Sequence, residues 1–218
     1  RMVLNTLRPA GVAVELPTTL VESAKAAVAR LPKISMVIAY EPDDEALVWV
    51  VAPGDPFAEA LRWAGAHSAP SFCVDPDIKY VERHRDPVPD PYVVWDLGGA
   101  DTMHLLRDYI SVVPSAADKR REAGMAFHAT RARKELGGLL LVLVGARHAT
   151  GVAHALQRPT AEPLARTSRA TVLVRHLHPD DLSGALMDAP VIHAAFEHLR
   201  DNTCPYPRAS LTHALPRK

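Results

Sequence analysis

The sequence predicts an α/β fold with a mainly parallel central sheet flanked by helices. Short apolar runs that are typical of strands alternate along the chain with stretches of helical periodicity, an order that favours parallel pairing. The clearest run, 139–144, reads LLLVLV; it follows two glycines and ends at Gly145. Such continuous apolarity is typical of a strand buried on both faces, as in parallel sheets.

Strand-like and helical segments in the first third of the chain support this class. A strand at 11–16 leads into a helical stretch at 18–31, which together make a strand-to-helix unit. Two further strand-like runs, 34–39 and 46–51, are joined by Glu-Pro-Asp-Asp, a turn composition. Either a hairpin or two separate sheet strands would satisfy this pattern.

The middle of the chain adds a helix, a strand and a long connection. Residues 56–66 place apolar side chains at helical spacing, and the short strand 71–74 follows and ends at Asp75. The proline-rich, charged stretch 76–101 has little periodicity and is interpreted as a long loop or insertion.

The rest of the chain continues the alternation of helices and strands. Helices are predicted at 101–110 and 116–136, and the second of these leads into the 139–144 strand. A strand at 171–177 and a helix at 191–200 follow. No internal repeat or low-complexity tract appears.

Length and charge favour one domain that binds small partners. We expect a single domain over 1–218, since a chain of this length can bury a sizeable core. The start at Arg1, just before the first strand, leaves open that the domain is truncated at its N-terminus. The 25 basic and 25 acidic residues balance, which argues against nucleic acid and against polybasic membrane attachment. A small-molecule or peptide substrate is expected instead, and the oligomeric state stays open.

Cysteine usage and hydropathy indicate a cytoplasmic protein. Only Cys73 and Cys204 are present, which is not a disulfide framework. The apolar runs are far shorter than the roughly 20 residues needed to span a bilayer, and the start lacks a signal pattern. We therefore expect a reducing compartment and no membrane association.

Three ionisable side chains stand at the ends of separate predicted strands: Glu15, Asp75 and His148. The carboxyl ends of parallel strands share one edge of the sheet, where ligands of such folds bind, so these groups should line one crevice. For Asp75 the alternative is a loop or capping acid beside Pro76, because aspartate is a common turn former.

The long helix 116–136 opens with charged residues that can serve the same crevice. Arg121 and Met125 lie four residues apart and share a helix face, so the guanidinium can reach the sheet edge while the methionine packs beneath it. The alternative is an ordinary solvated helix start. We expect Arg121 or the adjacent Glu122 to approach His148.

These residues together resemble a known superfamily. Arg121-Glu122 with Met125-Ala126, followed by a strand ending in Val-Gly-Ala-Arg-His148, is similar to the "RE..MA" and "VGxxH" motifs of the TraB, ChaN and erythromycin-esterase-like superfamily. The stretch RPAGVAVELP around Glu15 and the strand ending at Asp75 resemble its bacterial branch. The similarity spans most of positions 8 to 200.

The resemblance implies hydrolysis of an ester or peptide bond. It implies catalytic roles for Glu15, Arg121, Glu122 and His148, in which His148 is general base or metal ligand, the two glutamates position or activate water, and Arg121 stabilises negative charge. Asp75 is expected to bind substrate. A divalent metal occurs in some branches, with His148 and Glu15 the best ligands here, and haem binding occurs among ChaN-like relatives but is less expected.

One departure from the superfamily pattern supports a different function. Members usually begin with a strand that carries a Gly-x-x-His motif, and this chain has none before the Glu15 strand. The alternative function is therefore a non-catalytic ligand-binding or regulatory domain that has lost the first catalytic motif. Separately, His176 and His178 have a spacing that can hold a metal, although exposed strand-end positions explain them as well.

Overall fold

The structure is a computed structural model of the 218-residue chain. It describes residues 1–42, 46–78, 97, 101–102, 104–106, 114–158, 161–162, 164, 167, 169–186 and 188–200. The predicted loop 76–101 and helix 101–110 lie largely outside the described residues, although 101–102 and 104–106 are helical.

A three-stranded parallel sheet carries the candidate site, which confirms the α/β class. The strand β1 (Gly11–Pro17) lies between β4 (Ser71–Asp75) and β5 (Leu140–Leu143), and both neighbours run parallel to it. Val12, Ala13 and Val14 of β1 are fully buried, because the central strand is covered on both faces and both edges.

The second sheet is antiparallel, which the mainly parallel prediction did not include. The strands β2 (Ser35–Tyr40) and β3 (Ala46–Val51) form a hairpin, and β6 (Thr171–His176) pairs with the other side of β2. Along β2, fully buried residues alternate with partly buried ones. This alternation is typical of antiparallel sheets with one solvated face, so the hairpin alternative for 34–51 is confirmed.

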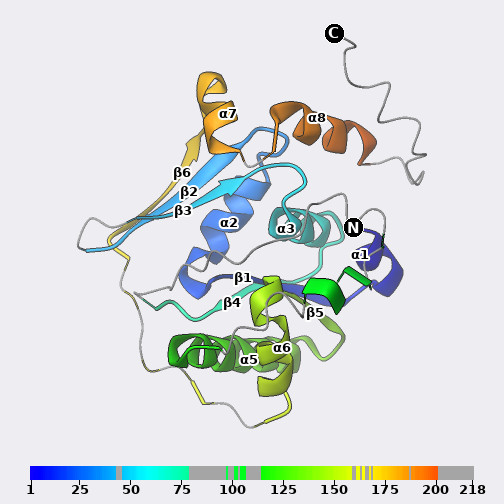
Figure 1. The fold of residues 1–218 in the computed structure, drawn as a ribbon, viewed down its shortest axis with the longest axis vertical. Coiled ribbons are helices and arrows are strands. Elements are labelled where there is room, and N and C mark those ends of the chain that lie inside the picture. Colours follow the sequence, from blue (N-terminus) through cyan, green and yellow to red (C-terminus); the bar gives the residue numbers. More distant parts are fainter. Residues whose placement is uncertain are drawn as a thin grey trace.

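Helices cover both faces of the parallel sheet, as Figure 1 shows. The helix α3 (Pro56–Ala66) lies on one face with α2 (Val21–Val28) beside it, and α5 (Ala116–Leu136) and α6 (Ala146–Ala155) lie on the other. The predicted helix 18–31 is shorter than expected. It begins as a 3-10 turn, η1 (Thr18–Leu20), and α2 ends at Val28.

One apolar core joins the two sheets. Val12 and Val14 of β1, Val37 of β2 and Val51 of β3 belong to the same buried cluster, together with residues of α2 and α3. Burial of this apolar surface holds the antiparallel sheet against the helices that cover the parallel one.

The remaining elements are short helices. The helices α1 (Met2–Leu7) and α7 (Leu182–Ala185), and the 3-10 turn η2 (Pro179–Asp181), were not predicted, while α8 (Pro190–Leu199) matches the predicted 191–200 within one residue. Among the described residues, no helix combines the length and apolarity that crossing a membrane requires.

The prediction that 139–144 is buried on both faces was wrong. β5 is an edge strand among the described residues, its four residues are only partly buried, and Leu139 before it is 54% exposed. The prediction that this run forms a strand of the parallel sheet is confirmed. Burial, however, depends on which strands and helices flank it, and the run itself does not encode them.

A buried ion-pair cluster fixes the segment that leaves β4. Arg169, just before β6, donates to Glu41 after β2 (2.9 Å) and to Asp77 two residues after β4, and Asp77 also accepts from the Thr19 hydroxyl. The side chains of all three charged residues are buried. The cluster therefore ties the carboxyl end of β4 to the antiparallel sheet.

Candidate functional site

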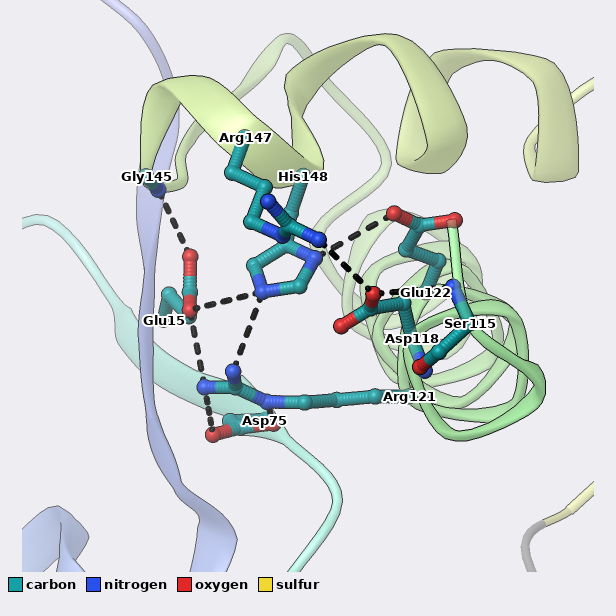
Figure 2. A network of polar contacts seen from close by, with 9 residues as sticks. All are labelled: Glu15, Asp75, Ser115, Asp118, Arg121, Glu122, Gly145, Arg147 and His148. Atoms are coloured by element: carbon teal, nitrogen blue, oxygen red, sulfur yellow. Dashed lines mark hydrogen bonds and ion pairs between the residues drawn. The ribbon is translucent and has the colours of Figure 1, made fainter. Parts of the chain in front are cut away.

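The three predicted strand-end residues meet at the carboxyl edge of the parallel sheet, as predicted. Glu15 lies near the end of β1, Asp75 ends β4, and His148 follows β5 in the first turn of α6. Figure 2 shows the three side chains around the guanidinium of Arg121, which reaches them from α5. His148 is a helix residue and not a strand-end residue, because it lies in α6, a helix that the sequence did not predict.

A register shift between β1 and β4 occurs between Val14 and Pro17, the interval that contains Glu15. Val14 pairs with Cys73 and Pro17 pairs with Asp75, so β1 contains one more residue than β4 over this interval. An extra residue of this kind bends a strand and redirects its side chains. The irregularity therefore lies where the Glu15 carboxylate turns toward Arg121.

The Arg121 guanidinium is the centre of the site. Nε and Nη2 donate to the two oxygens of Asp75 at 2.8 and 2.7 Å, Nη2 also donates to Glu15 Oε1 at 2.8 Å, and Nη1 donates to His148 Nε2 at 3.0 Å. These contacts use four of the five N–H donors of the group. The fifth, on Nη1, meets no acceptor among the residues that the structure describes.

Hydrogen bonding fixes the tautomer of His148. A guanidinium can only donate, so Nε2 of the ring must accept from Arg121, and the ring proton lies on Nδ1. Nδ1 then donates to Glu122 Oε1 at 3.2 Å. This places a carboxylate behind the imidazole, the arrangement that orients a general base.

The start of α6 brings a backbone donor and a second arginine into the network. Glu15 Oε2 accepts from the Gly145 N–H at 2.6 Å, so the carboxylate stands at the N-terminus of α6, where the helix dipole favours negative charge. Arg147 donates to Asp118 Oδ2 at 3.3 Å. The first turns of α5 and α6 are thus joined on the side of His148 away from β1.

Asp118 belongs to a capping box that starts α5. Its backbone N–H donates to the Ser115 hydroxyl at 3.1 Å, and its carboxylate accepts from the Ser115 N–H at 3.0 Å. Burial raises the pKa of the Asp118 carboxyl, but the hydrogen bonds from Ser115 and Arg147 outweigh it, and the net shift is downward. For Arg121, burial lowers the pKa, but the hydrogen bonds and charge of Asp75 and the charge of Glu15 outweigh it and raise the pKa overall, so the guanidinium stays charged.

The structure brings together every predicted site residue: Glu15, Asp75, Arg121, Glu122 and His148. Met125 is fully buried beneath Arg121, as its spacing predicted. Asp75 was expected to bind substrate, yet both of its oxygens accept from Arg121, so here it orients the guanidinium. The catalytic roles of the other four residues stay predictions.

Sequence reasoning missed four members of the network: Ser115, Asp118, Gly145 and Arg147. The Ser-x-x-Asp spacing at the start of the predicted helix was a readable signal for the capping pair. No comparable signal marks Arg147, because its contact depends on how α5 and α6 pack against each other.

The described side chains do not fit the divalent metal or the haem that the superfamily resemblance implies. The Arg121 guanidinium occupies the space between Glu15, Asp75 and His148, and it uses the lone pairs that a cation would need. Across the described ranges, no cluster of three or more His, Cys, Asp or Glu side chains has metal-binding geometry. His148 is equally unsuited as an axial ligand of haem, since it is 5% exposed and both of its ring nitrogens are hydrogen-bonded.

Other nucleophiles and histidines lie outside the network. Burial raises the pKa of the Cys73 thiol to about 12, so it is not a thiolate at neutral pH. His176 contacts Arg30, and His178 caps η2; both are exposed, as their strand-end interpretation predicts.

Comparisons with known proteins find no matching family model, no matching curated protein and no matching solved structure.

Gly151 of α6 provides a test of the contact between His148 and Glu122. A Cβ at this position would lie 2.0 Å from Glu122 Oε2, so Gly151→Ala must displace the carboxylate from His148. We expect a loss of about 1–3 kcal/mol in the free energy of unfolding, typical of overpacking. Urea denaturation measures this loss.

The matched control is Gly65→Ala in α3, where a Cβ would meet nothing within 4 Å. This change should be neutral or stabilise by up to about 1 kcal/mol, since alanine is the better helix former. Equal stability of the two variants would contradict the close packing of α6 on Glu122.

The lowered pKa of Asp118 predicts a specific acid sensitivity. Because the carboxylate is stabilised in the folded state, its contribution is present above the unfolded pKa of about 4 and is lost as the pH falls through the lower folded value. Asp118→Asn should be less stable than wild type at pH 7 and should lose less stability between about pH 5 and pH 2. Parallel acid-denaturation curves for the two proteins would show that Asp118 contributes nothing to this dependence.

Proposed function

We propose that the chain is a hydrolase-like domain that cleaves an ester or peptide bond with His148 as general base and Arg121 as the oxyanion-stabilising group. The observation that carries the proposal is the series of hydrogen bonds from Glu122 through His148 to Arg121. The Glu122 carboxylate orients the imidazole at Nδ1, and the lone pair of Nε2 accepts from the Arg121 guanidinium. The resemblance to the TraB, ChaN and erythromycin-esterase-like superfamily supports the same residues.

In the proposed first step, water attacks the substrate carbonyl carbon. The water proton passes to His148 Nε2, and the carbonyl oxygen takes the electron pair of its π bond and becomes an oxyanion. Nε2 must first lose the hydrogen bond from Arg121 Nη1, so the imidazole shifts away from the guanidinium and Nη1 donates to the oxyanion instead. Transfer of this donor from base to substrate couples proton abstraction to charge stabilisation.

In the second step the tetrahedral intermediate collapses. The carbon–oxygen or carbon–nitrogen bond to the leaving group breaks, and the imidazolium returns its proton to the leaving alcohol or amine. Until then Nδ1–H is held by Glu122, and Nε2–H faces Glu15 Oε1, 3.9 Å away in the resting arrangement. Asp75 keeps the guanidinium plane in place through its bidentate contact.

The electrostatics of the network favour an uncharged or positively charged substrate. Four carboxylates, Glu15, Asp75, Asp118 and Glu122, surround two guanidinium groups and an imidazole whose nitrogens share one proton. The formal charge of the network is therefore negative, which disfavours an anionic substrate. Gly145 is exposed, so solvent reaches the network beside Glu15.

One observation favours the alternative, a non-catalytic binding or regulatory domain. The charged groups bond mainly to one another, and the side chains of Asp75, Glu122 and His148 are each at least nine-tenths buried. A closed network of this kind can have a purely structural role, which is to hold α5 and α6 against the sheet. In that case, removal of His148 would alter stability and ligand binding but no turnover.

The experiment that separates the two functions is His148→Ala, assayed on p-nitrophenyl esters and on a pool of quenched fluorogenic peptides. If His148 is the base, the variant should lose at least about 10²-fold in kcat/KM on whichever substrate wild type cleaves, since general acid–base groups contribute at least that much. Wild type that cleaves neither substrate class would contradict the hydrolase proposal.

The matched control is His154→Ala, which removes an exposed histidine from the same helix. It should retain wild-type turnover. Melting curves of both variants show whether a loss of activity reflects lost chemistry or a lost fold.

A further inference from the structure

A cavity of about 410 Å³ lies along β4, on the side of the strand away from β1. On the strand side it is lined by Phe72, Cys73 and Val74, and beyond the strand by Pro76 and Asp77. The opposite wall comes from one side of α5, including Ala132 and Glu135, and Thr18 and Thr19 of η1 contribute further polar groups. We call this cavity the β4 groove; its volume is in the range of ligand pockets.

The β4 groove runs along one edge of the parallel sheet. Among the strands that the structure describes, β4 pairs with β1 alone. The Val12 N–H donates to the Pro70 carbonyl at 3.0 Å, and in a parallel ladder alternate residues direct their backbone groups to the same side. The backbone N–H and carbonyl groups of Phe72 and Val74 therefore point toward β1. Those of Cys73 point away from β1, into the groove.

Backbone groups at a free sheet edge are complementary to another extended backbone. The groove also contains apolar side chains at alternate positions: Phe72 and Val74 pack on the α5 side of the sheet, together with Ala129. This combination suits a peptide strand that pairs with Cys73 and directs every second side chain toward the apolar wall.

We propose that the β4 groove binds an extended peptide segment, which adds to the sheet as a strand next to β4. The position of the groove deepens the proposed function, on which this part of the inference rests. The groove ends at Asp77, two residues after Asp75 of the Arg121 network. A peptide bound along β4 is thereby led toward His148, which favours peptides over small esters as substrates.

The test uses the full chain carrying His148→Ala, so that bound peptide is not consumed, and a phage-displayed library of random decapeptides as the probe. Selected peptides are resynthesised with single backbone N-methyl groups. Methylation should weaken binding by at least about tenfold at every second residue and have little effect in between, because a paired strand directs alternate N–H groups to its partner. Hydrogen exchange should show new protection of the Cys73 amide.

A groove-filling variant and a matched control complete the test. Thr18→Trp, at a half-buried groove position, should weaken binding by at least about tenfold, whereas Thr6→Trp, at an exposed position of α1, should leave binding unchanged. If Thr18→Trp does not fold, the N-methyl pattern and the Cys73 protection decide alone.

Failure of the groove and failure of the hydrolase are distinguishable. If no decapeptide is selected, or if bound peptides show no two-residue pattern and leave Cys73 unprotected, the groove proposal is overturned even where wild type cleaves esters. If peptides bind with the expected pattern but wild type cleaves neither them nor esters, the groove proposal is supported and the hydrolase proposal is contradicted.

Discussion

The buried guanidinium of Arg121 is the contact on which the carboxyl edge of the parallel sheet depends. It extends from α5 to β1 through Glu15, to β4 through Asp75 and to α6 through His148. Without this cation, two buried carboxylates would face each other uncompensated, a situation that typically costs about 3–5 kcal/mol. The same contacts that stabilise the edge therefore also determine which atoms of His148 and Arg121 are available for chemistry.

Much of this edge was predictable because it follows from topology. Glu15, Asp75 and the Gly145-x-x-His148 segment each follow a short apolar run, and parallel strands end on one side of their sheet. The four-residue spacing of Arg121 and Met125 then predicted which helix face meets that edge. Local sequence patterns were sufficient to predict the position of a residue wherever that position depends only on the strand or helix that contains it.

Other features depend on contacts between distant segments, and the sequence did not predict them. The pairing of β6 with β2 joins residues that lie more than a hundred positions apart, so the apolar runs alone could not separate the two sheets. The exposure of β5 depends on its edge position, and the Arg147–Asp118 contact depends on the packing of α6 against α5. The helix α6 was overlooked because its apolar residues follow directly on a long strand-like run.

The site and the β4 groove make a consistent pair. The network around Arg121 is closed and compact, whereas the groove beside β4 combines an apolar wall with backbone groups that none of the described strands pairs with. Binding and chemistry would then occupy consecutive residues of one strand, from Cys73 to Asp75. The coupling requires that bound substrate separates His148 Nε2 from Arg121 Nη1, because only then can the imidazole accept a proton.

The measurement that tests the account most directly is the tautomer of His148, read from the ¹⁵N chemical shifts of its ring. We expect a proton on Nδ1, directed at Glu122, and an unprotonated Nε2 that accepts from Arg121. A resting protein with the proton on Nε2 would mean that Arg121 does not donate to the ring. That result would contradict both the network and the base proposed from it.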